Sequence, residues 1–544
     1  FSCKRTGLQF RHGIVRTLKK ICCKENRLYL TMTENAENSK KTSLQRSAEK
    51  LTEEIQSMAN YKSLYAEIQK LVASTAVKRE DFKNTLLEAL KSNGLETEIR
   101  NTVFHWVRSQ GSLSTATEVS MEEVDLTYLK KAQIQWERRI QKSLNSTCNE
   151  LNVPLARIRP NADREEFAEK WNELSTYDID LSQYRPLYAP KDFLDVLFSI
   201  RNPAFKKHSR VYLELAKGMS LLGVNPDMPS SENFGNLEEE RIFIGEKVLK
   251  SNHAPIAQQF LKRGAPRALR GSLWSLVLGS IVKQNDIEYY EELKNMVLQY
   301  DIVIDKLIIK DVQLTARNDD QYFVFEDVLY KTMLCFSRDS EVLAPVTTDR
   351  SAGGQVIHAV LQGKPATLEN TLVFPPSGVI PFHGFTMYAT PFCYLYDDPC
   401  AMYYTFRAFY LRYWFRLHTV SSHEQGIVAL CLLFERLLQC HEPLLWIHFR
   451  NIHIQPVRIV FKWIMRGFSG HLPPEQLLCL WDLILAYDSL EIIPLLAVTI
   501  LSFRKENLMQ VNNQQSVEVK IDFILITHLP IIYLLLHIYL NLYY

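Results

Sequence analysis

Residues 264–274 read GAPRALRGSLW, and this short stretch decides the fold that the sequence predicts for its C-terminal half. Pro266 has a fixed φ angle and presets a turn. Gly271 lets another part of the chain approach closely, because it has no side chain. Leu273 and Trp274 supply apolar side chains for a buried anchor at the start of a helix. The stretch therefore predicts a turn that leads into the first helix of a packed domain.

A second block of this kind lies near the other end of the same half. Leu472 and Pro473 form a turn, and the segment after them ends in Trp481 and Asp482. We expect Trp481 to lie in the core and Asp482 to be a structural hydrogen-bond or salt-bridge partner. Between the two blocks, apolar residues recur at helical spacing and strand-like alternation is rare. The sequence therefore predicts an all-α domain over residues 236–510.

Together the two blocks resemble those of TBC domains, the module of proteins that activate Rab GTPases. The resemblance covers residues from about 120 to 510. It implies an all-helical fold, a Rab GTPase in its GTP-bound state as partner, and a role in vesicle trafficking. It also implies an activator that acts in trans and has no active site of its own. The residues that carry it are Gly264, Pro266, Leu269, Arg270, Gly271, Trp274, Trp481 and Asp482.

The family, as it is understood, accelerates GTP hydrolysis with two side chains. An arginine neutralises charge on the transferring phosphoryl group, and a glutamine orients the attacking water. The resemblance places the arginine in an Ile-x-x-Asp-x-x-Arg motif and the glutamine in a Tyr-x-Gln-Gly motif. Residues 308–315 read IIKDVQLT, so Asp311 matches and Leu314 holds the arginine position. Residues 381–384 read PFHG, so Gly384 matches and His383 holds the glutamine position.

The replacements at positions 314 and 383 remove the side chains that the family uses to stabilise phosphoryl charge and to orient the water. An arginine finger contributes about 10³–10⁵ in rate, and leucine has neither a charge nor a hydrogen-bond donor. Histidine can hold a water or donate to a phosphate oxygen, but it cannot do both as an amide does. We therefore expect the dual-finger mechanism to be absent. In one interpretation Arg317 or Arg350 acts as a displaced finger, whereas in the simpler one Arg317 is a solvated charge.

Two functions stay open at this point. The first is a GTPase-activating protein for Rab GTPases whose activation is weak or absent unless a displaced arginine serves. The second is a non-catalytic adaptor or scaffold that keeps the Rab-binding surface. In that case the N-terminal region engages a further partner, which the sequence does not identify.

Composition divides the chain into five parts, and all of the predicted elements are helices. Residues 1–42 are polar and basic, and we expect them to be disordered. Residues 43–224 form a smaller helical N-terminal region, in which a Ser-x-x-Glu capping box at Ser120 opens a long amphipathic helix. Residues 225–235 read NPDMPSSENFG and form a linker. Residues 236–510 are the TBC domain, and residues 511–544 form an atypical hydrophobic tail.

Both ends of the chain allow more than one interpretation. The chain begins at Phe1, which indicates a fragment or a conceptual translation. Its basic first residues superficially resemble a transit peptide, but a solvated tail is the simpler interpretation. Residues 521–544 are long enough for a tail anchor, although polar residues and Pro530 interrupt them. A last core helix or mistranslated sequence are the alternatives.

Composition also excludes several classes of protein. Hydrophobic residues make up 47% and charged residues 23% of the chain, as in an ordinary globular protein. The formal net charge of +2 argues against a nucleic-acid binder. Ten cysteines are too few for a disulfide scaffold, which favours a cytoplasmic protein. We expect membrane association to be indirect, peripheral on endomembranes, unless residues 521–544 are an anchor.

No cofactor or metal is expected. His441, His448 and His453 are close in sequence, but their spacing does not align them on one helix face. The sequence contains no Gly-x-x-x-x-Gly-Lys-Ser/Thr loop, so it does not predict a nucleotide hydrolase of that type.

Overall fold

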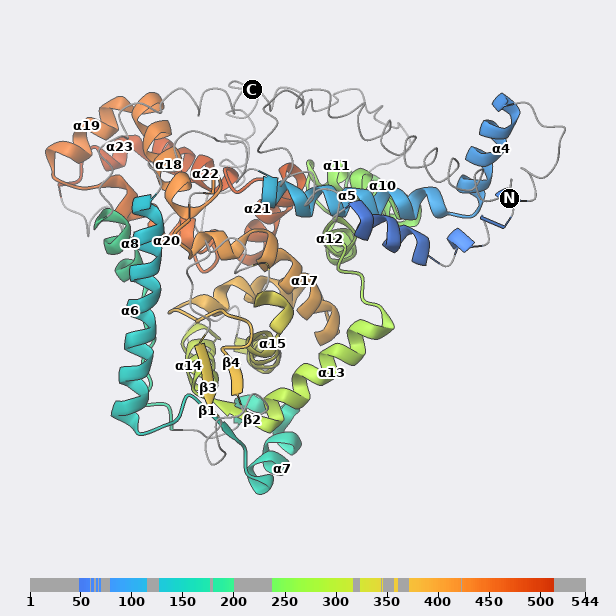
Figure 1. Cartoon of the computed structure of the whole chain (residues 1–544). Helices are drawn as coiled ribbons and strands as arrows, with labels where there is room; N and C mark the ends of the chain where they lie inside the picture. The colour runs from blue at the N-terminus through green and yellow to red at the C-terminus, as the bar shows by residue number, and fades with distance from the viewer. Residues whose placement is uncertain are drawn as a thin grey trace. The chain divides into compact units, whose positions relative to one another are not determined.

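The computed structural model describes residues 48–58, 60–62, 65–66, 68–69, 79–114, 127–176, 180–199, 237–316, 323–343, 345, 357–360, 371–421 and 423–512. Helices dominate these residues, which confirms the all-α prediction. The chain divides into two compact units, Phe1–Trp106 and Val107–Tyr544. Figure 1 shows the order of their elements along the chain.

The first unit has a small core of its own. It contains α4 (Arg79–Ser92) and the start of α5 (Leu95–Ser114), which continues into the second unit. Ile68 and Leu95 are buried at its centre. Leu86 and Leu90, four residues apart on α4, pack against them, so one face of this helix is turned toward the core.

The second unit contains most of the helices. Before the expected linker they are α6 (Thr127–Leu151), α7 (Asn161–Glu169) and α8 (Pro190–Ser199). After it they are α10 (Leu237–Ser251), α11 (Ala254–Leu261), α12 (Arg270–Leu278), α13 (Gln284–Gln299), α14 (Val303–Ala316), α15 (Glu326–Arg338), α17 (Pro399–Arg412), α18 (Ile427–His441), α19 (Pro443–Asn451), α20 (Pro456–Met465), α21 (Pro474–Tyr487), α22 (Ile492–Phe503) and α23 (Lys505–Leu508).

Two short antiparallel ladders accompany these helices. β3 (Ile357–Val360) pairs with β4 (Thr371–Phe374). β1 (Ala156–Ile158) pairs with β2 (Tyr300–Ile302). The second pairing joins a strand from the N-terminal region to one that directly precedes α14. The expected linker at 225–235 lies outside the described residues, so that boundary stays a prediction.

Aromatic side chains tie the N-terminal helices of this unit to its later ones. Trp136 on α6 lies 5.1 Å from Tyr188 and 5.5 Å from Phe193 of α8, measured between ring centroids. Phe193 in turn lies 6.3 Å from Phe461 of α20. Figure 1 shows α6, α8 and α20 at the same side of the unit. The long amphipathic helix expected near Ser120 is α6, whereas its capping box lies outside the described residues.

The core of the unit is built around tryptophans. Trp274 of α12, Trp414 and Trp481 of α21 are fully buried, as predicted for the first and last. The rings of Trp414 and Trp481 are 4.8 Å apart. Phe409 of α17 lies 5.5 Å from Trp274 and 5.4 Å from Trp481, so it joins the two predicted blocks.

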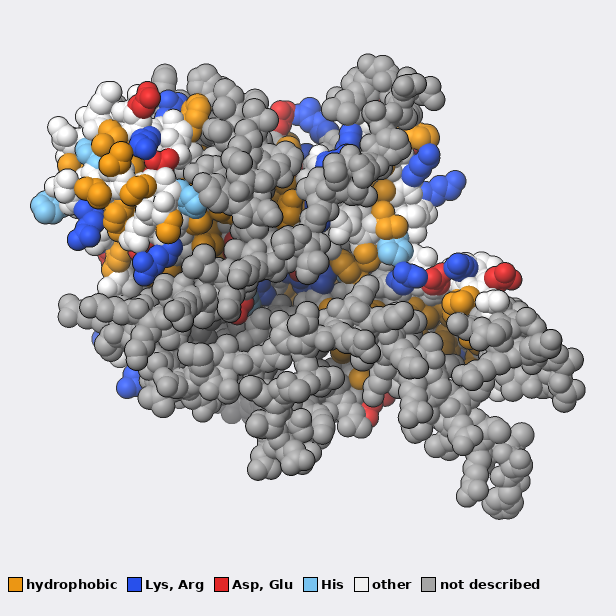
Figure 2. All heavy atoms as spheres, turned by 90° about the horizontal axis from the view of Figure 1, so that it is seen from above, with side chains coloured by type: hydrophobic (Ala, Val, Ile, Leu, Met, Phe, Trp, Pro, Cys, Tyr) orange, Lys and Arg blue, Asp and Glu red, His pale blue; other side chains and the backbone are white. Residues whose placement is uncertain are grey.

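One end of the unit has an apolar and basic surface. Leu444 and Ile447 of α19 are 60% and 52% exposed. Figure 2 shows hydrophobic side chains at this end, mixed with basic, acidic and histidine side chains.

None of the helices in the described residues is long and apolar enough to cross a bilayer. The expected tail at 521–544 lies outside them.

Candidate functional site

The two sequence blocks meet at the carboxylate of Asp482. Asp482 is 0% exposed and accepts hydrogen bonds from three groups of the first block. Ala265 N lies 2.9 Å and Arg270 Nε lies 3.1 Å from Oδ2. Trp274 Nε1 lies 2.6 Å from Oδ1. Asp482 therefore joins the two blocks through a buried ion pair and hydrogen bonds.

Asp482 and Arg270 form a buried ion pair inside the core. Burial raises the pKa of Asp482, while the charge of Arg270 and the hydrogen bonds from Ala265 and Trp274 oppose the rise. Arg270 also donates to Ala265 O over 3.0 Å, so one guanidinium holds both a side chain and the backbone. Removing one partner of such a buried pair costs about 3–5 kcal/mol, because the other charge is left unpaired.

The rest of the first block shapes the turn before α12. Arg241 donates to Gly264 O, and Pro266 begins the short helix η4 (Arg267–Leu269). A Cβ added at Gly271 would lie 2.8 Å from Leu395 O, so the backbone approaches too closely here for a side chain.

A second buried carboxylate, Asp311 of α14, holds the segment that follows β4. Its Oδ1 accepts from Gly384 N over 2.6 Å. Its Oδ2 accepts from Thr386 N over 2.8 Å and from Thr386 Oγ1 over 2.6 Å. These groups begin the short helix η8 (Phe385–Tyr388), so Asp311 caps that helix from a neighbouring one. We name residues 381–386 the 381–386 loop.

A guanidinium approaches the other side of this loop. Arg466, which follows α20, donates from Nη2 to His383 O over 3.1 Å. Burial lowers the pKa of Arg466, and Asp311 raises it again. Burial raises the pKa of Asp311, while the hydrogen bonds from Thr386 and Gly384 and the charge of His383 oppose the rise.

Position 384 favours glycine. Its φ angle is +88°, a left-handed value that residues with a side chain rarely adopt. A Cβ there would also lie 2.2 Å from Nη2 of Arg466. The backbone conformation therefore favours glycine, and any side chain here would also have to displace the guanidinium of Arg466.

The backbone of His383 is held from both sides, while its ring reaches the surface. His383 N donates to Tyr188 O over 3.0 Å, and His383 O accepts from Arg466. The ring of the preceding Phe382 is stacked 5.6 Å from that of Tyr188. The His383 side chain is 43% exposed, and its Nδ1 lies 3.9 Å from Asp311 Oδ1.

Leu314 lies one turn after Asp311 on α14 and is partly exposed. Residues three apart on a helix are neighbours, about 5–6 Å between Cβ atoms. Since Asp311 also binds Gly384, positions 314 and 383 lie close to the same anchor. Arg317 and Arg350 lie outside the described residues, so a displaced finger at either position stays a hypothesis.

Comparison with known proteins identifies the fold that holds this site. The model of the Rab-GTPase-TBC domain matches residues 382–509. TBC1 domain family member 19 of Homo sapiens is 44% identical over 468 residues, which cover 81% of this chain and 88% of that protein. The chain belongs to the Rab-GTPase-TBC family. The match to the TBC domain model begins inside the 381–386 loop and includes Arg466 and Asp482.

Two solved TBC domains are similar at low TM-scores. The Chlamydomonas flagellar RabGAP TBC domain has a TM-score of 0.39 and 14% identity, and the match covers 52% of this chain and 84% of that one. The Ypt/Rab-GAP domain of Gyp1p has the same score and identity, with coverage of 57% and 100%.

Three residues of the TBC domain site were not predicted from the sequence. Thr386 lies two residues after Gly384, at the start of η8. Threonine is common at helix N-termini, so its position in the sequence could have suggested a helix cap. Tyr188 acts through its main-chain carbonyl, which leaves no signal in the sequence. Arg466 is distant from both motifs along the chain, and only the fold brings it to His383.

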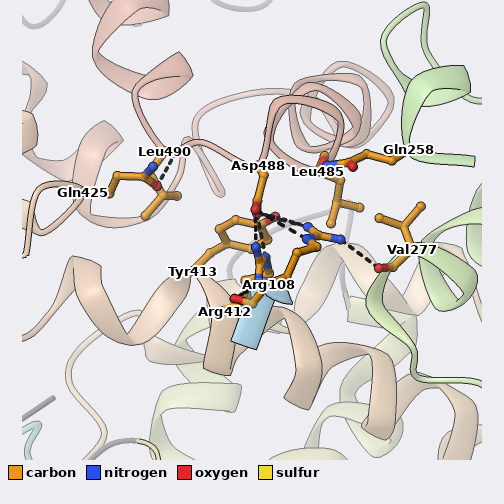
Figure 3. A network of polar contacts seen from close by, with 9 residues as sticks. All are labelled: Arg108, Gln258, Val277, Arg412, Tyr413, Gln425, Leu485, Asp488 and Leu490. Atoms are coloured by element: carbon orange, nitrogen blue, oxygen red, sulfur yellow. Dashed lines mark hydrogen bonds and ion pairs between the residues drawn. The ribbon is translucent and has the colours of Figure 1, made fainter. Parts of the chain in front are cut away.

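A third carboxylate, Asp488, ends α21 in the TBC domain and serves a structural purpose (Figure 3). It binds Arg108 of α5 over 3.0 Å, the hydroxyl of Tyr413 over 2.7 Å, and Arg412. Arg108 also donates to Val277 O over 2.9 Å. Although burial acts to raise the pKa of Asp488, Arg108 and Arg412 hold it well below its usual range.

Proposed function

We propose that residues 237–512 bind a GTP-loaded Rab GTPase and present α14 and the 381–386 loop to the nucleotide. One observation carries the proposal. Asp311 fixes Gly384 and Thr386, so the helix with position 314 and the loop with position 383 are held as one piece. This is what a surface needs if it is to address a single phosphoryl group. The proposal places the activity in the cytoplasm, on trafficking membranes reached through the Rab.

The same proposal limits the rate of hydrolysis. Leu314 has neither charge nor donor, so it cannot stabilise negative charge on the phosphoryl group. Loss of an arginine finger removes about 10³–10⁵ of the stimulation. We propose a Rab GTPase activator that works without the arginine finger and is therefore much weaker than one that has it.

The partial exposure of Leu314 also favours a second candidate, a non-catalytic Rab-binding adaptor. An apolar side chain at this position suits a packing contact with a protein surface. In this form, the domain keeps its docking face and contributes no rate enhancement.

Single-turnover GTP hydrolysis by a panel of Rab proteins, with and without the full chain, tests both candidates. Binding is measured in parallel with each Rab loaded with a non-hydrolysable GTP analogue. Binding with weak stimulation supports the activator, and binding without stimulation supports the adaptor. If no GTP-loaded Rab binds at micromolar concentration, both candidates are wrong.

A further inference from the structure

We infer that the outer side of α19 rests on an anionic membrane surface, with Leu444 and Ile447 in contact with the lipid and Arg450 beside its headgroups. We name these three residues the α19 face. The inference goes beyond the proposed function, because it gives a separate surface of the domain a lipid partner. It can be tested without a Rab, so its failure would leave the proposed function untouched.

α19 is apolar on two sides, although only one of them is buried. Leu445 and Phe449 are 0% exposed and pack in the core. Leu444 and Ile447 are exposed, and their spacing of three residues makes them neighbours on the outer side of the helix. A helix that is apolar all round is typical of a buried environment. The outer side of α19 therefore has the composition of a contact surface.

The segment that follows α23 enlarges this apolar surface. His448 of α19 donates from Nε2 to Val511 O over 3.0 Å, so this segment lies beside α19. Met509, two residues before Val511, is 39% exposed. Exposed apolar side chains from two parts of the chain therefore gather at one end of the domain.

The charges near the α19 face favour an anionic partner. Between Glu442 and Glu475 the sequence has no acidic residue. The basic residues in this interval are Arg450, Arg458, Lys462 and Arg466. Glu442 is buried and is bound by Lys505 over 2.8 Å, so its charge is matched within the protein. Glu506 of α23 is exposed, but two basic residues directly precede it. The surface is therefore apolar at its centre and basic around it.

This pattern suits a membrane better than it suits a second copy or the chain's own C-terminal residues. A symmetrical dimer through the α19 face would set Arg450 close to the Arg450 of the other copy, and like charges repel. Residues 521–544 contain Asp522 as their only acidic residue, so they offer little charge to match the basic side chains. Anionic lipids place negative headgroups directly beside an apolar layer.

Co-sedimentation of the full chain with vesicles tests the inference. Vesicles of phosphatidylcholine mixed with phosphatidylserine should bind the chain, and vesicles of phosphatidylcholine alone should bind it much less. Binding to the mixed vesicles should weaken as the salt concentration rises, because salt screens the attraction to the headgroups. Equal binding to both kinds of vesicle, or binding to neither, overturns the inference.

A double substitution locates the apolar contact. Leu444→Ser with Ile447→Ser should lower the affinity for mixed vesicles about 10-fold or more, since two apolar side chains are removed from the lipid. Ile281→Ser with Ile287→Ser is the matched control and should leave the affinity unchanged. Ile281 and Ile287 are similarly exposed, but they lie at the start of α13, which Figure 1 shows well away from α19. Equal affinities for wild type and the α19 variant overturn the inference, because another part of the chain then binds the bilayer.

A charge substitution tests the headgroup contact. Arg450→Gln should lower the affinity for mixed vesicles about fivefold, which is the typical effect of one basic residue near an anionic surface. Arg164→Gln is the control, because Arg164 is exposed on α7, at the opposite end of the unit in Figure 1. An equal loss of affinity in both variants would contradict a contact at α19.

Light scattering on the free chain completes the test. We expect the same molar mass for wild type and for Leu444→Ser with Ile447→Ser. A wild-type dimer that dissociates in this variant, without any binding to vesicles, overturns the inference and shows that a second copy covers the face.

Discussion

Two of the buried aspartates, Asp482 and Asp311, do opposite things. Asp482 is bound by the guanidinium of Arg270, an indole and a backbone amide, all inside the core. Asp311 is bound by two backbone amides and a hydroxyl, and it holds a loop whose histidine reaches the surface. Asp482 therefore joins groups within the core, whereas Asp311 holds a loop that reaches the surface.

The difference shows that some residues of a candidate site only hold the backbone in place and take no part in the chemistry. The anchor at Asp311 keeps the 381–386 loop in place whatever side chain stands at positions 314 and 383, because it uses only residues 384 and 386. Chemistry at the surface can therefore change while the loop keeps its shape. The cluster at Asp482 has no such freedom, because each of its side chains is also part of the core.

The largest effect should come from restoring chemistry on the intact scaffold. Leu314→Arg with His383→Gln should raise the stimulated single-turnover rate by about 10³-fold or more, since a finger contributes about 10³–10⁵. Gln313→Arg is the matched control, because its side chain points about 100° away around the helix. No gain with binding intact would mean that the loop geometry has drifted from a productive one.

The next effect concerns folding. Asp482→Asn should lower the free energy of unfolding by about 3–5 kcal/mol, because Arg270 is left buried with its charge unpaired. Trp274→Ala should lower it by a similar amount, about 3–5 kcal/mol. Urea denaturation measures both.

Glu475→Gln is the control for the folding effect, since it removes an exposed ion pair between α21 and Arg267 of η4, the short helix directly before α12. It should change stability by less than about 1 kcal/mol. Normal unfolding curves for Asp482→Asn and Trp274→Ala would contradict the structural role of the first carboxylate.

A smaller effect should follow from weakening the second carboxylate. Thr386→Val removes one hydrogen bond to Asp311 and should destabilise the domain by about 1.5–3 kcal/mol. Hydrogen exchange at Gly384 and Thr386 should become faster than in wild type. Thr499→Val, which removes only a bond to Leu495 O within its own helix, is the control. Unchanged exchange in the 381–386 loop would show that the anchor does not depend on the hydroxyl.

The smallest effect should be the loss of stability at low pH that protonation of the third carboxylate, Asp488, causes. The folded pKa of Asp488 is held below its unfolded value of about 3.9, so its stabilisation is present above that pH and is lost as the pH falls further. The loss is at most about 1.4 kcal/mol for each pH unit. In Asp488→Asn, melting temperatures measured from pH 5 to pH 2 should fall less steeply than in wild type. Parallel curves would contradict the pairing with Arg108 and Arg412.

The sequence predicted the core more fully than the site. Apolar residues at helical spacing were enough to predict an all-α domain, because such positions are defined by packing. The family motifs also made Asp311 and Gly384 candidate site residues, and a hydrogen bond joins the two in the structure.

What the sequence did not predict depends on main-chain atoms and on segments far apart. Tyr188 contributes a carbonyl, which every residue has, so its identity reveals nothing about that bond. The approach of Arg466 to Gly384 depends on where α20 ends relative to η8. Asp488 directly follows α21, and only the fold brings Arg108 to it.

The guanidinium beside Gly384 has a consequence for how genomes are interpreted. Any residue other than glycine at this position would strain the backbone and would have to displace the guanidinium of Arg466, whether or not the protein acts on a GTPase. Natural selection for folding alone would then keep the glycine in a lineage that has lost its activity. A conserved glycine in this motif should therefore not be taken as a marker of an active enzyme when related sequences are classified.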